Sequence, residues 1–442
     1  MSRDEDLVAH IGALAYKGTG HLNPLLALSR RLIAHGHRVT FFQHPDLQCQ
    51  ILQQGVEFFP ISSGTPGKVQ LFRRYRWMQG LGLGEIDDRL RRIDQEIATF
   101  LSVYPSAIRA AGVDALLLGE ISLAGPTVAE LLGLPYFIVS TSIPHNFGWK
   151  APRSITGPRS MRVSIRNAFL EISLLRLRGP VRRILDRYRR QLRLGPIRSK
   201  AKNSLELAHI TQWPQCLEDQ LPQPAETYYT GPFIDCQGRT RIDFPWDRLD
   251  GRPLVYASLG TTRKGELTTF YRIAEACSEL HVQLIITLGG RRDPAVLAEL
   301  PGDPVIVSNA PQLELMQKAS MVITHAGPNT VLEALMLGKP MLALPITLDQ
   351  PAVAWRLARS GAAEVLSPQH RSTRGIRHAL AKVLEDPHYR QAALRLKAEM
   401  SAIDGIGRAV EIIESKLAVV SPELHVARLC HNGVTRTGKK SL

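Results

Sequence analysis

Residues 323–350 read ITHAGPNTVLEALMLGKPMLALPITLDQ, and this stretch predicts a strand end, a helix and a second strand in close succession. Gly327 permits a tight turn after the first apolar run, and Pro328 suits the first position of a helix. Residues 329–337 then have helical periodicity, and residues 341–344 form another apolar run. A strand, a helix and a strand in this order form parallel neighbours whose carboxyl ends lie at the same edge of a sheet.

The same alternation extends along most of the chain on both sides of this stretch. Further strands are predicted at residues 8–16, 38–42, 115–118, 136–140, 254–258, 283–287, 305–307 and 321–324. Further helices are predicted at residues 23–34, 124–132, 267–280, 313–319, 372–384, 388–401 and 404–417. Repeated strand–helix–strand units are typical of parallel sheets with helices on both faces. We therefore predict an α/β fold of two doubly wound, Rossmann-like domains that face a cleft between them.

A stretch rich in charges and turn-forming residues interrupts this alternation and predicts a linker between two domains. The expected division is an N-terminal domain over residues 1–234, the linker over 235–253, a C-terminal domain over 254–402, a helix over 403–419 that packs back on the N-terminal domain, and a flexible tail over 420–442. A length of 442 residues and an apolar content of 44% agree with globular domains and exclude an intrinsically disordered protein.

The net charge of +15 is concentrated in one segment of the chain. Residues 150–202 contain sixteen Lys or Arg against two acidic residues, so this segment alone carries +14. Its residues 181–192 have apolar side chains at helical spacing. Elsewhere on this helix lie Arg182, Arg183, Arg187 and Arg190. A basic amphipathic helix suits the surface of an anionic membrane, and solvated arginines on an ordinary surface helix are the alternative. No aromatic-interleaved motif of an RNA-binding module is present, so we expect no nucleic-acid partner.

Five scattered cysteines without CxxC spacing are typical of a reduced protein of the cytoplasm. The N-terminus, MSRDEDLVAH, lacks the apolar region of a secretory signal, and residues 131–149 are too polar for a transmembrane helix. We therefore expect a cytoplasmic protein that contacts the inner face of the membrane through its basic segment. Apart from residues 4–6 no DxD-like acidic motif occurs, and we expect neither a metal ion nor a bound cofactor.

Polar residues with the chemistry of an anion site gather around the helix in the quoted stretch. His325 lies at the tip of the strand, and Asn329 and Thr330 add side-chain donors where free N–H groups and the helix dipole favour a phosphate. Glu333 lies one turn further on the same face, where its carboxylate can accept two hydroxyls such as those of a ribose. A structural histidine, a helix cap and a solvated acid are the ordinary interpretations of these residues taken singly. Their joint spacing favours a binding site.

Two neighbouring loops extend this rim of polar residues. Asp349 and Gln350 follow the next strand along the chain and can fix the hydroxyls of a sugar. A hydroxyl-rich loop follows the first strand of the C-terminal domain, and it contains Ser258, Gly260 and Thr261. Because the carboxyl ends of parallel strands meet at one edge, partners for a phosphate, a ribose and a sugar line up along that edge.

In the N-terminal half, the loop after the first strand presents a histidine beside glycines. Gly18 and Gly20 permit a tight turn that brings His21 to the mouth of the predicted cleft, where an imidazole can take a proton from a hydroxyl. A histidine that only stabilises the turn is one alternative, and a dinucleotide-binding G-x-G-x-x-G loop is another. The dinucleotide motif lacks its third glycine, since Asn23 stands there, and the second strand ends without the acidic residue that binds a ribose.

Residues 310–350, from APQ through HxGxNTxxE and GKP to DQ, resemble the donor-binding signature of family 1 glycosyltransferases, which have the GT-B fold. The resemblance extends over nearly the whole chain, and the chain looks most like the bacterial zeaxanthin (carotenoid) and macrolide-type enzymes of that family. It implies inverting, metal-independent transfer of a hexose, with glucose expected, from a UDP-sugar to a hydroxyl of a lipophilic carotenoid, polyketide or phenol. It also implies that the N-terminal domain binds the acceptor and the C-terminal domain the nucleotide sugar.

The resemblance also implies roles for individual residues. They are diphosphate binding by His325, Asn329 and Thr330, ribose binding by Glu333, uracil binding by Gln312, and sugar binding by Asp349 and Gln350. His21 would be the general base. An orienting acid is expected after the strand at 115–118, where Gly119 stands and Glu120 follows. Asn309 and Pro328 stand where plant members have tryptophans, one of which stacks on uracil.

Two other functions remain open on the sequence alone. A sugar-nucleotide epimerase of the same architecture would release a modified nucleotide sugar without any second substrate. A membrane- or nucleic-acid-binding protein without catalysis would use the basic segment over residues 150–202, but it leaves the pattern over residues 310–350 unexplained.

Overall fold

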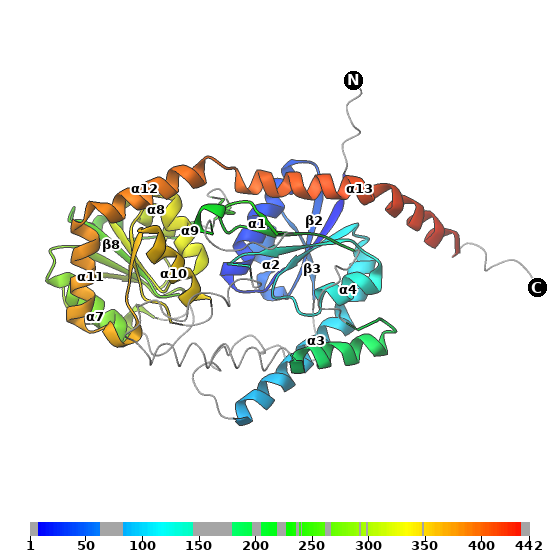
Figure 1. The fold of residues 1–442 in the computed structure, drawn as a ribbon, viewed down its shortest axis with the longest axis horizontal. Helices are drawn as coiled ribbons and strands as arrows, with labels where there is room; N and C mark the ends of the chain where they lie inside the picture. Colours follow the sequence, from blue (N-terminus) through cyan, green and yellow to red (C-terminus); the bar gives the residue numbers. More distant parts are fainter. Residues whose placement is uncertain are drawn as a thin grey trace, which may run out of the picture.

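The computed structural model contains two α/β domains, each built around its own parallel sheet (Figure 1). It describes residues 8–61, 83–144, 179–196, 205–218, 227–235, 238–239, 241–260, 267–290, 293–297, 299–346 and 349–434. The predicted architecture of two doubly wound, Rossmann-like domains is confirmed.

The N-terminal sheet has parallel strands in the order β3-β2-β1-β4-β5-β6-β7. They are β1 (His10–Leu14), β2 (Arg38–Gln43), β3 (Glu57–Pro60), β4 (Ala115–Gly119), β5 (Tyr136–Ser140), β6 (Glu206–Thr211) and β7 (Thr227–Tyr229). Helices around it include α1 (Thr19–Ala34), α2 (Gln48–Leu52), α3 (Leu83–Ala111) and α4 (Gly125–Leu132). Every residue of β4 is buried, because a parallel sheet covered on both faces needs a continuous apolar run at its centre.

The C-terminal sheet has the order β10-β9-β8-β11-β12-β13, and its strands are also parallel. They are β8 (Leu254–Ser258), β9 (Gln283–Thr287), β10 (Val305–Val307), β11 (Met321–Thr324), β12 (Met341–Ala343) and β13 (Ala363–Val365). The helices are α7 (Leu267–Ser278), α8 (Gln312–Lys318), α9 (Pro328–Met336), α10 (Gln350–Ser360), α11 (Thr373–Glu385) and α12 (Pro387–Ser401). The central strands β8 and β11 are fully buried, as the quoted motif predicts for its first strand.

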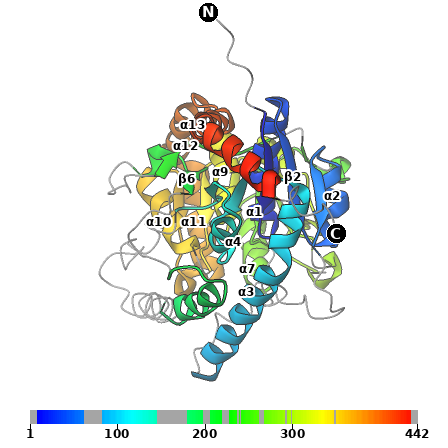
Figure 2. The same cartoon turned by 90° about the vertical axis from the view of Figure 1, so that its right-hand side faces the viewer.

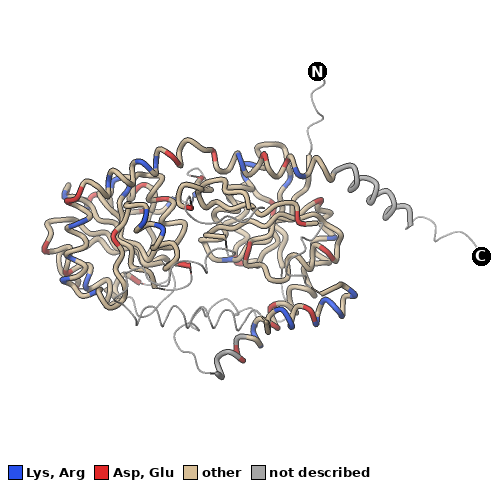
Figure 3. The backbone as a smooth tube through the Cα atoms, viewed as in Figure 1, with Lys and Arg blue, Asp and Glu red and all other residues tan. Residues whose placement is uncertain are grey.

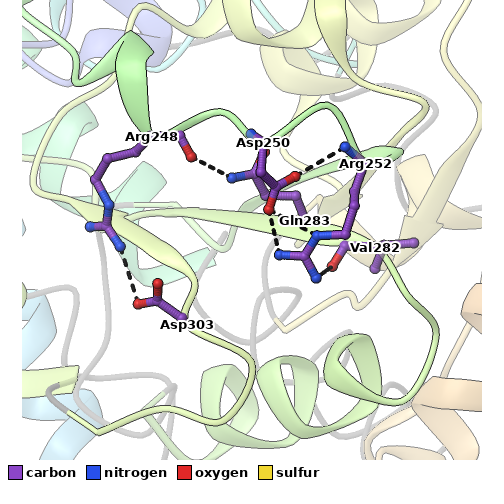
Figure 4. Close-up of polar contacts among 6 residues, drawn as sticks. All are labelled: Arg248, Asp250, Arg252, Val282, Gln283 and Asp303. Atoms are coloured by element: carbon purple, nitrogen blue, oxygen red, sulfur yellow. Dashed lines mark hydrogen bonds and ion pairs between the residues drawn. The ribbon is translucent and has the colours of Figure 1, made fainter.

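The linker is held against the starts of the strands of the C-terminal sheet (Figure 4). Gln283, the first residue of β9, donates from Nε2 to the carbonyl of Arg248 at 2.6 Å and accepts through Oε1 from the N–H of Asp250 at 3.1 Å. Arg252 forms an ion pair with Asp250 at 2.6 Å. These contacts lie at the opposite end of the strands from the loops that follow β8 and β11.

The last helix, α13 (Gly405–Val434), leaves the C-terminal domain and packs on the N-terminal one (Figures 1 and 2). Its buried side chains join the core around α1, and they are Ile406, Ala409, Val410, Ile413 and Leu417. Arg31 of α1 also forms an ion pair with Asp404 at 2.8 Å. The first half of α13 therefore belongs to the core of the N-terminal domain.

Residues 420–434, the first part of the expected flexible tail over residues 420–442, continue α13 as a helix. Residues 423–431 read ELHVARLCH, in which one Glu, one Ala, one Arg and two Leu favour a helix, but the loss of apolar periodicity after Val420 concealed it. Residues 435–442 lie outside the described part of the chain.

The chain crosses between the domains twice, and the two crossings meet at a pair of glycines. A Cβ atom added to Gly405 would lie 2.6 Å from the carbonyl carbon and oxygen of Gly231. Gly231 itself has φ of +101°, in a region that favours glycine. The two connections therefore lie against each other, backbone on backbone, between the sheets.

Candidate active site

Loops that follow the carboxyl ends of the two sheets contact each other across the domain boundary. Asn329, at the start of α9, donates from Nδ2 to the carbonyl of Gly20 at 2.6 Å. Ser142, just beyond β5, donates from Oγ to Oδ2 of Asp349, which precedes α10. Ligands of open α/β sheets bind outside these strand ends, so the contacts mark where a site shared by both domains lies.

His325 lies directly after β11 and is packed between two glycines. A Cβ atom added to Gly260 would lie 2.7 Å from Nε2 of His325, and one added to Gly327 would lie 2.6 Å from it. Nδ1 of His325 is buried and has no hydrogen-bond partner within the described ranges. Burial lowers the pKa of His325 to about 4, although the Ser258 backbone acts in the opposite direction. His325 is therefore a neutral imidazole near pH 7, able to donate one hydrogen bond from its ring.

The amino terminus of α9 is open. The helix begins at Pro328 after Gly327, and no side chain among those that the structure describes caps it. Asn329 and Thr330 lie in its first turn and are partly exposed. Free N–H groups and the helix dipole at such a terminus attract anions, so this end of α9 has the chemistry to bind a phosphate.

Glu333, one turn into α9, is 5% exposed and already held by two donors. Arg239, from the linker, forms an ion pair with its Oε1, and Nε2 of Gln312 donates to its Oε2 at 2.5 Å. Gln312 in turn accepts from the hydroxyl of Tyr256 at 3.0 Å. Gln312 and Glu333, predicted from sequence to bind uracil and ribose, are thus brought together. No motif pointed to Arg239, because it belongs to a linker with no sequence pattern of its own.

The loop before α10 brings the two predicted sugar-binding residues to the domain boundary. Asp349 contacts Ser142 of the N-terminal domain, as noted above. Gln350 is buried, and its Oε1 accepts from the N–H of Ile346 at 2.9 Å. Ser258 ends β8 as a buried residue, Gly260 follows with φ of +77°, and Thr261 lies outside the described residues.

His21 lies in the first turn of α1 and is held by a hydroxyl that no sequence motif indicated. Its Nδ1 is hydrogen-bonded to Oγ1 of Thr141 at 2.7 Å. Tyr16 packs edge-on against its ring, with 5.4 Å between ring centroids and 87° between ring planes. Thr141 follows β5, so the two residues come from segments 120 positions apart in the chain. With Nδ1 engaged, Nε2 is the ring nitrogen suited to proton transfer.

Glu120, the predicted orienting acid, follows β4 at the same sheet edge. Its Oε1 lies 3.9 Å from Nε2 of His209, which is hydrogen-bonded to Oγ of Ser140 at 2.6 Å. Thr141 is hydrogen-bonded to Nδ1 of His21. The role of Glu120 toward His21 stays a prediction.

The basic segment is described only over residues 179–196, and its helix over residues 179–191 packs on α3. The predicted apolar stripe faces the protein, because Val181, Ile184, Leu185 and Tyr188 pack with residues of α3 such as Ile97 and Phe100. This stripe is therefore not available for insertion into lipid. The rest of the basic segment, residues 150–178 and 197–202, lies outside the described residues.

The four arginines singled out in this helix are exposed. Arg187 forms an ion pair with Asp94 of α3 at 2.5 Å, Arg182 lies 3.6 Å from Asp186, and Arg190 donates to the carbonyl of Asp186 at 3.3 Å. Helix 179–191 carries five arginines and one aspartate, and α3 beside it carries acidic as well as basic residues (Figure 3). In the described part of the chain no helix combines the length and apolar composition needed to cross a membrane.

Comparison with known families and proteins gives matches on both domains. Residues 250–414 match the model of the family described as UDP-glucoronosyl and UDP-glucosyl transferase, and residues 13–144 match the glycosyltransferase family 28 N-terminal domain. Zeaxanthin glucosyltransferase of Pantoea ananas is 26% identical over 94% of this chain and 98% of that protein. The enzyme of the same name from Pseudescherichia vulneris is 28% identical over 93% and 98%. Oleandomycin glycosyltransferase of Streptomyces antibioticus is 26% identical over 92% and 91%.

Solved structures share the fold along nearly the whole chain. The calicheamicin glycosyltransferase superposes with a TM-score of 0.71 at 19% identity, covering 94% of this chain and 100% of that one. A spinosyn rhamnosyltransferase complexed with spinosyn aglycone gives a TM-score of 0.66 at 22% identity, covering 91% and 99%. At these identities the likeness establishes the arrangement of two facing domains.

Proposed function

We propose that this chain, a family 1 glycosyltransferase with the GT-B fold, transfers a hexose from a UDP-sugar to a hydroxyl of a lipophilic small molecule. Glucose is the first candidate for the hexose. The observation that carries the proposal is the open amino terminus of α9 beside the neutral imidazole of His325, facing the His21 loop across the domain boundary. The relatives named for zeaxanthin and oleandomycin support a bulky, hydroxylated acceptor.

In the proposed donor site, the diphosphate lies at the start of α9. Backbone N–H groups, the side chains of Asn329 and Thr330, and a hydrogen bond from His325 stabilise the charge that develops on the departing diphosphate. Because His325 is neutral, it acts as a hydrogen-bond donor and adds no positive charge. These donors perform the work that a metal ion performs elsewhere, so we propose that transfer is independent of metal and of any cofactor.

The remaining contacts with the UDP-sugar come from residues along the same edge of the C-terminal sheet. Glu333 accepts the ribose hydroxyls and exchanges part of its contact with Arg239 when the nucleotide binds, while Gln312 lies beside it on the uracil side. Asp349 and Gln350 bind the hydroxyls of the transferred sugar. This arrangement places the anomeric carbon between α9 and the N-terminal domain.

In the proposed reaction, His21 removes the proton from the acceptor hydroxyl through Nε2 as the oxygen attacks the anomeric carbon. The bond between this carbon and the diphosphate breaks in the same displacement, so the configuration at the carbon inverts. Thr141 supports the orientation of the imidazole from its other nitrogen. Alignment of base, hydroxyl and anomeric carbon is the main source of rate in such a step.

The test is to incubate the purified protein with a panel of UDP-sugars and lipophilic alcohols and to weigh the products by mass spectrometry. The expected result is a hexose added to an acceptor, unchanged by EDTA, with a β-linked product from an α-linked donor. Release of a modified UDP-sugar without any acceptor would favour the epimerase alternative. Loss of transfer in EDTA would overturn metal independence, and a retained α-linkage would overturn the single displacement.

We also propose that the exposed arginines of helix 179–191 contact an anionic membrane surface, where a carotenoid-like acceptor would be dissolved. Each Lys or Arg near such a surface contributes about 1 kcal/mol, and salt screens the attraction. Since the apolar stripe packs on α3, this contact is electrostatic and shallow. The protein should sediment with anionic liposomes at low salt and leave them at high salt. Absence of binding at low salt would show that the arginines only face water.

A further inference from the structure

Gln212 is a buried glutamine at the end of β6 whose amide joins the two domains. It is 1% exposed. Its Nε2 donates to the carbonyl of Thr141 at 2.5 Å and to Oδ1 of Asn329 at 2.6 Å. Its Oε1 accepts from the N–H of Phe233 at 3.2 Å. Both hydrogens of the amide nitrogen are thus used, one toward each domain.

These two bonds complete a closed ring around the site. Thr141 holds Nδ1 of His21, and Asn329, on the other side of Gln212, donates to the carbonyl of Gly20, the residue before His21. Starting from His21, the ring passes through Thr141, Gln212, Asn329 and Gly20 and returns to His21. It contains both the proposed base and a proposed diphosphate ligand.

We propose that Gln212 is a positioning residue, which fixes the His21 imidazole relative to the diphosphate end of the donor. This inference rests on the proposed function, because it concerns the geometry of that same reaction. The base belongs to one domain and the leaving group to the other, so their separation depends on a tie between the domains. Gln212 supplies that tie through a neutral group, which takes no proton from the base. A misplacement of about 1 Å at such a site can lower the rate roughly 100-fold.

The first test compares Gln212→Met with Gln283→Met. Gln283 is a matched control, because it is also a buried glutamine whose Nε2 donates to a backbone carbonyl and whose Oε1 accepts from a backbone N–H, at the far end of the C-terminal sheet (Figure 4). We expect Gln212→Met to lower kcat by about 10- to 100-fold, with KM for the UDP-sugar changed by less than about threefold. Gln283→Met should lower Tm by a similar amount and leave kcat within about twofold of wild type.

The second test is a double-mutant cycle with His21→Ala. A merely structural role of Gln212 would not couple its effect on kcat to the presence of His21. If Gln212 acts through His21, adding Gln212→Met to His21→Ala should lower kcat by less than about twofold more. Losses of kcat that multiply in the double variant would overturn the proposal. So would a loss of kcat in Gln283→Met equal to that in Gln212→Met, because it would report stability alone.

These outcomes are distinguishable from failure of the proposed function. A folded wild-type protein that transfers no sugar from any UDP-sugar would overturn the proposed function and the inference with it. A wild-type protein that transfers sugar while Gln212→Met keeps its full kcat would overturn the inference alone.

Discussion

Two histidines lie at corresponding points of the two domains, each near the junction between a strand and the helix that follows it, yet their surroundings differ. His21 lies inside the first turn of α1 and is hydrogen-bonded to a threonine from a distant strand end. His325 lies before α9, between two glycines, with Nδ1 buried and unpartnered in the described part of the chain and its pKa lowered to about 4 by desolvation.

The difference teaches that position in the fold does not determine the chemistry of a residue. An oriented imidazole with one nitrogen engaged is suited to accept a proton, whereas a desolvated imidazole stays neutral and is suited to donate a hydrogen bond. The environment of His325 comes from its own loop and the adjacent one. The environment of His21 comes from Thr141 and, through it, from Gln212.

The largest expected effect separates the two histidines directly. His21→Ala should lower kcat by about 10²–10⁴ while leaving UDP affinity nearly unchanged, because it removes the base and no donor contact. His325→Ala should instead weaken UDP binding. Turnover measured at saturating substrates, with UDP titration calorimetry alongside, checks both. Full activity of His21→Ala at neutral pH would remove His21 from the mechanism and end the contrast.

The second prediction separates the residue proposed to bind the nucleotide from the one proposed to bind the sugar of the UDP-sugar. Glu333→Ala should weaken UDP binding by about 1–3 kcal/mol, since two ribose hydroxyls lose a charged acceptor and Arg239 loses its partner. Asp349→Ala should leave the affinity for UDP unchanged and impair use of the intact UDP-sugar, because Asp349 is proposed to bind the transferred sugar and not the nucleotide. Equal losses of UDP affinity for both variants would contradict this division.

The third prediction uses the lowered pKa of His325. Its pKa of about 4 in the folded protein lies below the ordinary value of 6.5, so the unfolded chain takes up the proton first as pH falls. The stability associated with neutral His325 is therefore complete above pH 6.5 and is lost as pH falls toward 4. The loss should be on the order of 3 kcal/mol. Urea unfolding at several pH values should show a flatter dependence for His325→Gln, and identical curves would mean that His325 is not desolvated.

The smallest expected effect concerns the support of His21. Thr141→Val keeps the shape of the side chain and removes the hydroxyl that bonds Nδ1, so kcat should fall by roughly tenfold. Binding of UDP should be unaffected, which calorimetry can check. A loss as large as that of His21→Ala would mean that the imidazole requires this hydroxyl absolutely, whereas no loss would leave Glu120 as its orienting partner.

The C-terminal half of the molecule was largely predictable because its site is local. His325, Asn329 and Glu333 lie within nine residues of one strand–turn–helix pattern, and that pattern fixes their relative positions. The strands and helices predicted between Leu254 and Ser401 fall close to their observed bounds. No element was predicted for α10 and β13, whose apolar residues are interrupted by charges.

The N-terminal half was less predictable because its site is assembled from distant segments. His21 was found through its glycines, but Thr141 and Gln212 follow strands with no motif of their own. Short or mixed strands such as β3 and β7 also give no clear alternation, and the long helix α3 was missed although its apolar residues have helical spacing. Contacts such as that between Arg239 and Glu333 depend on how the linker folds back, which no local pattern encodes.

The contact between Gly231 and Gly405 has a mechanical consequence. The two connections that the described residues trace between the domains lie against each other at these glycines, so the domains are joined at one place and not at two separate ones. We expect any relative motion of the two domains to be a rotation about the paired glycines, largest in the parts of each domain that lie farthest from them. A larger side chain at either glycine would force the two connections apart and shift the axis of rotation itself.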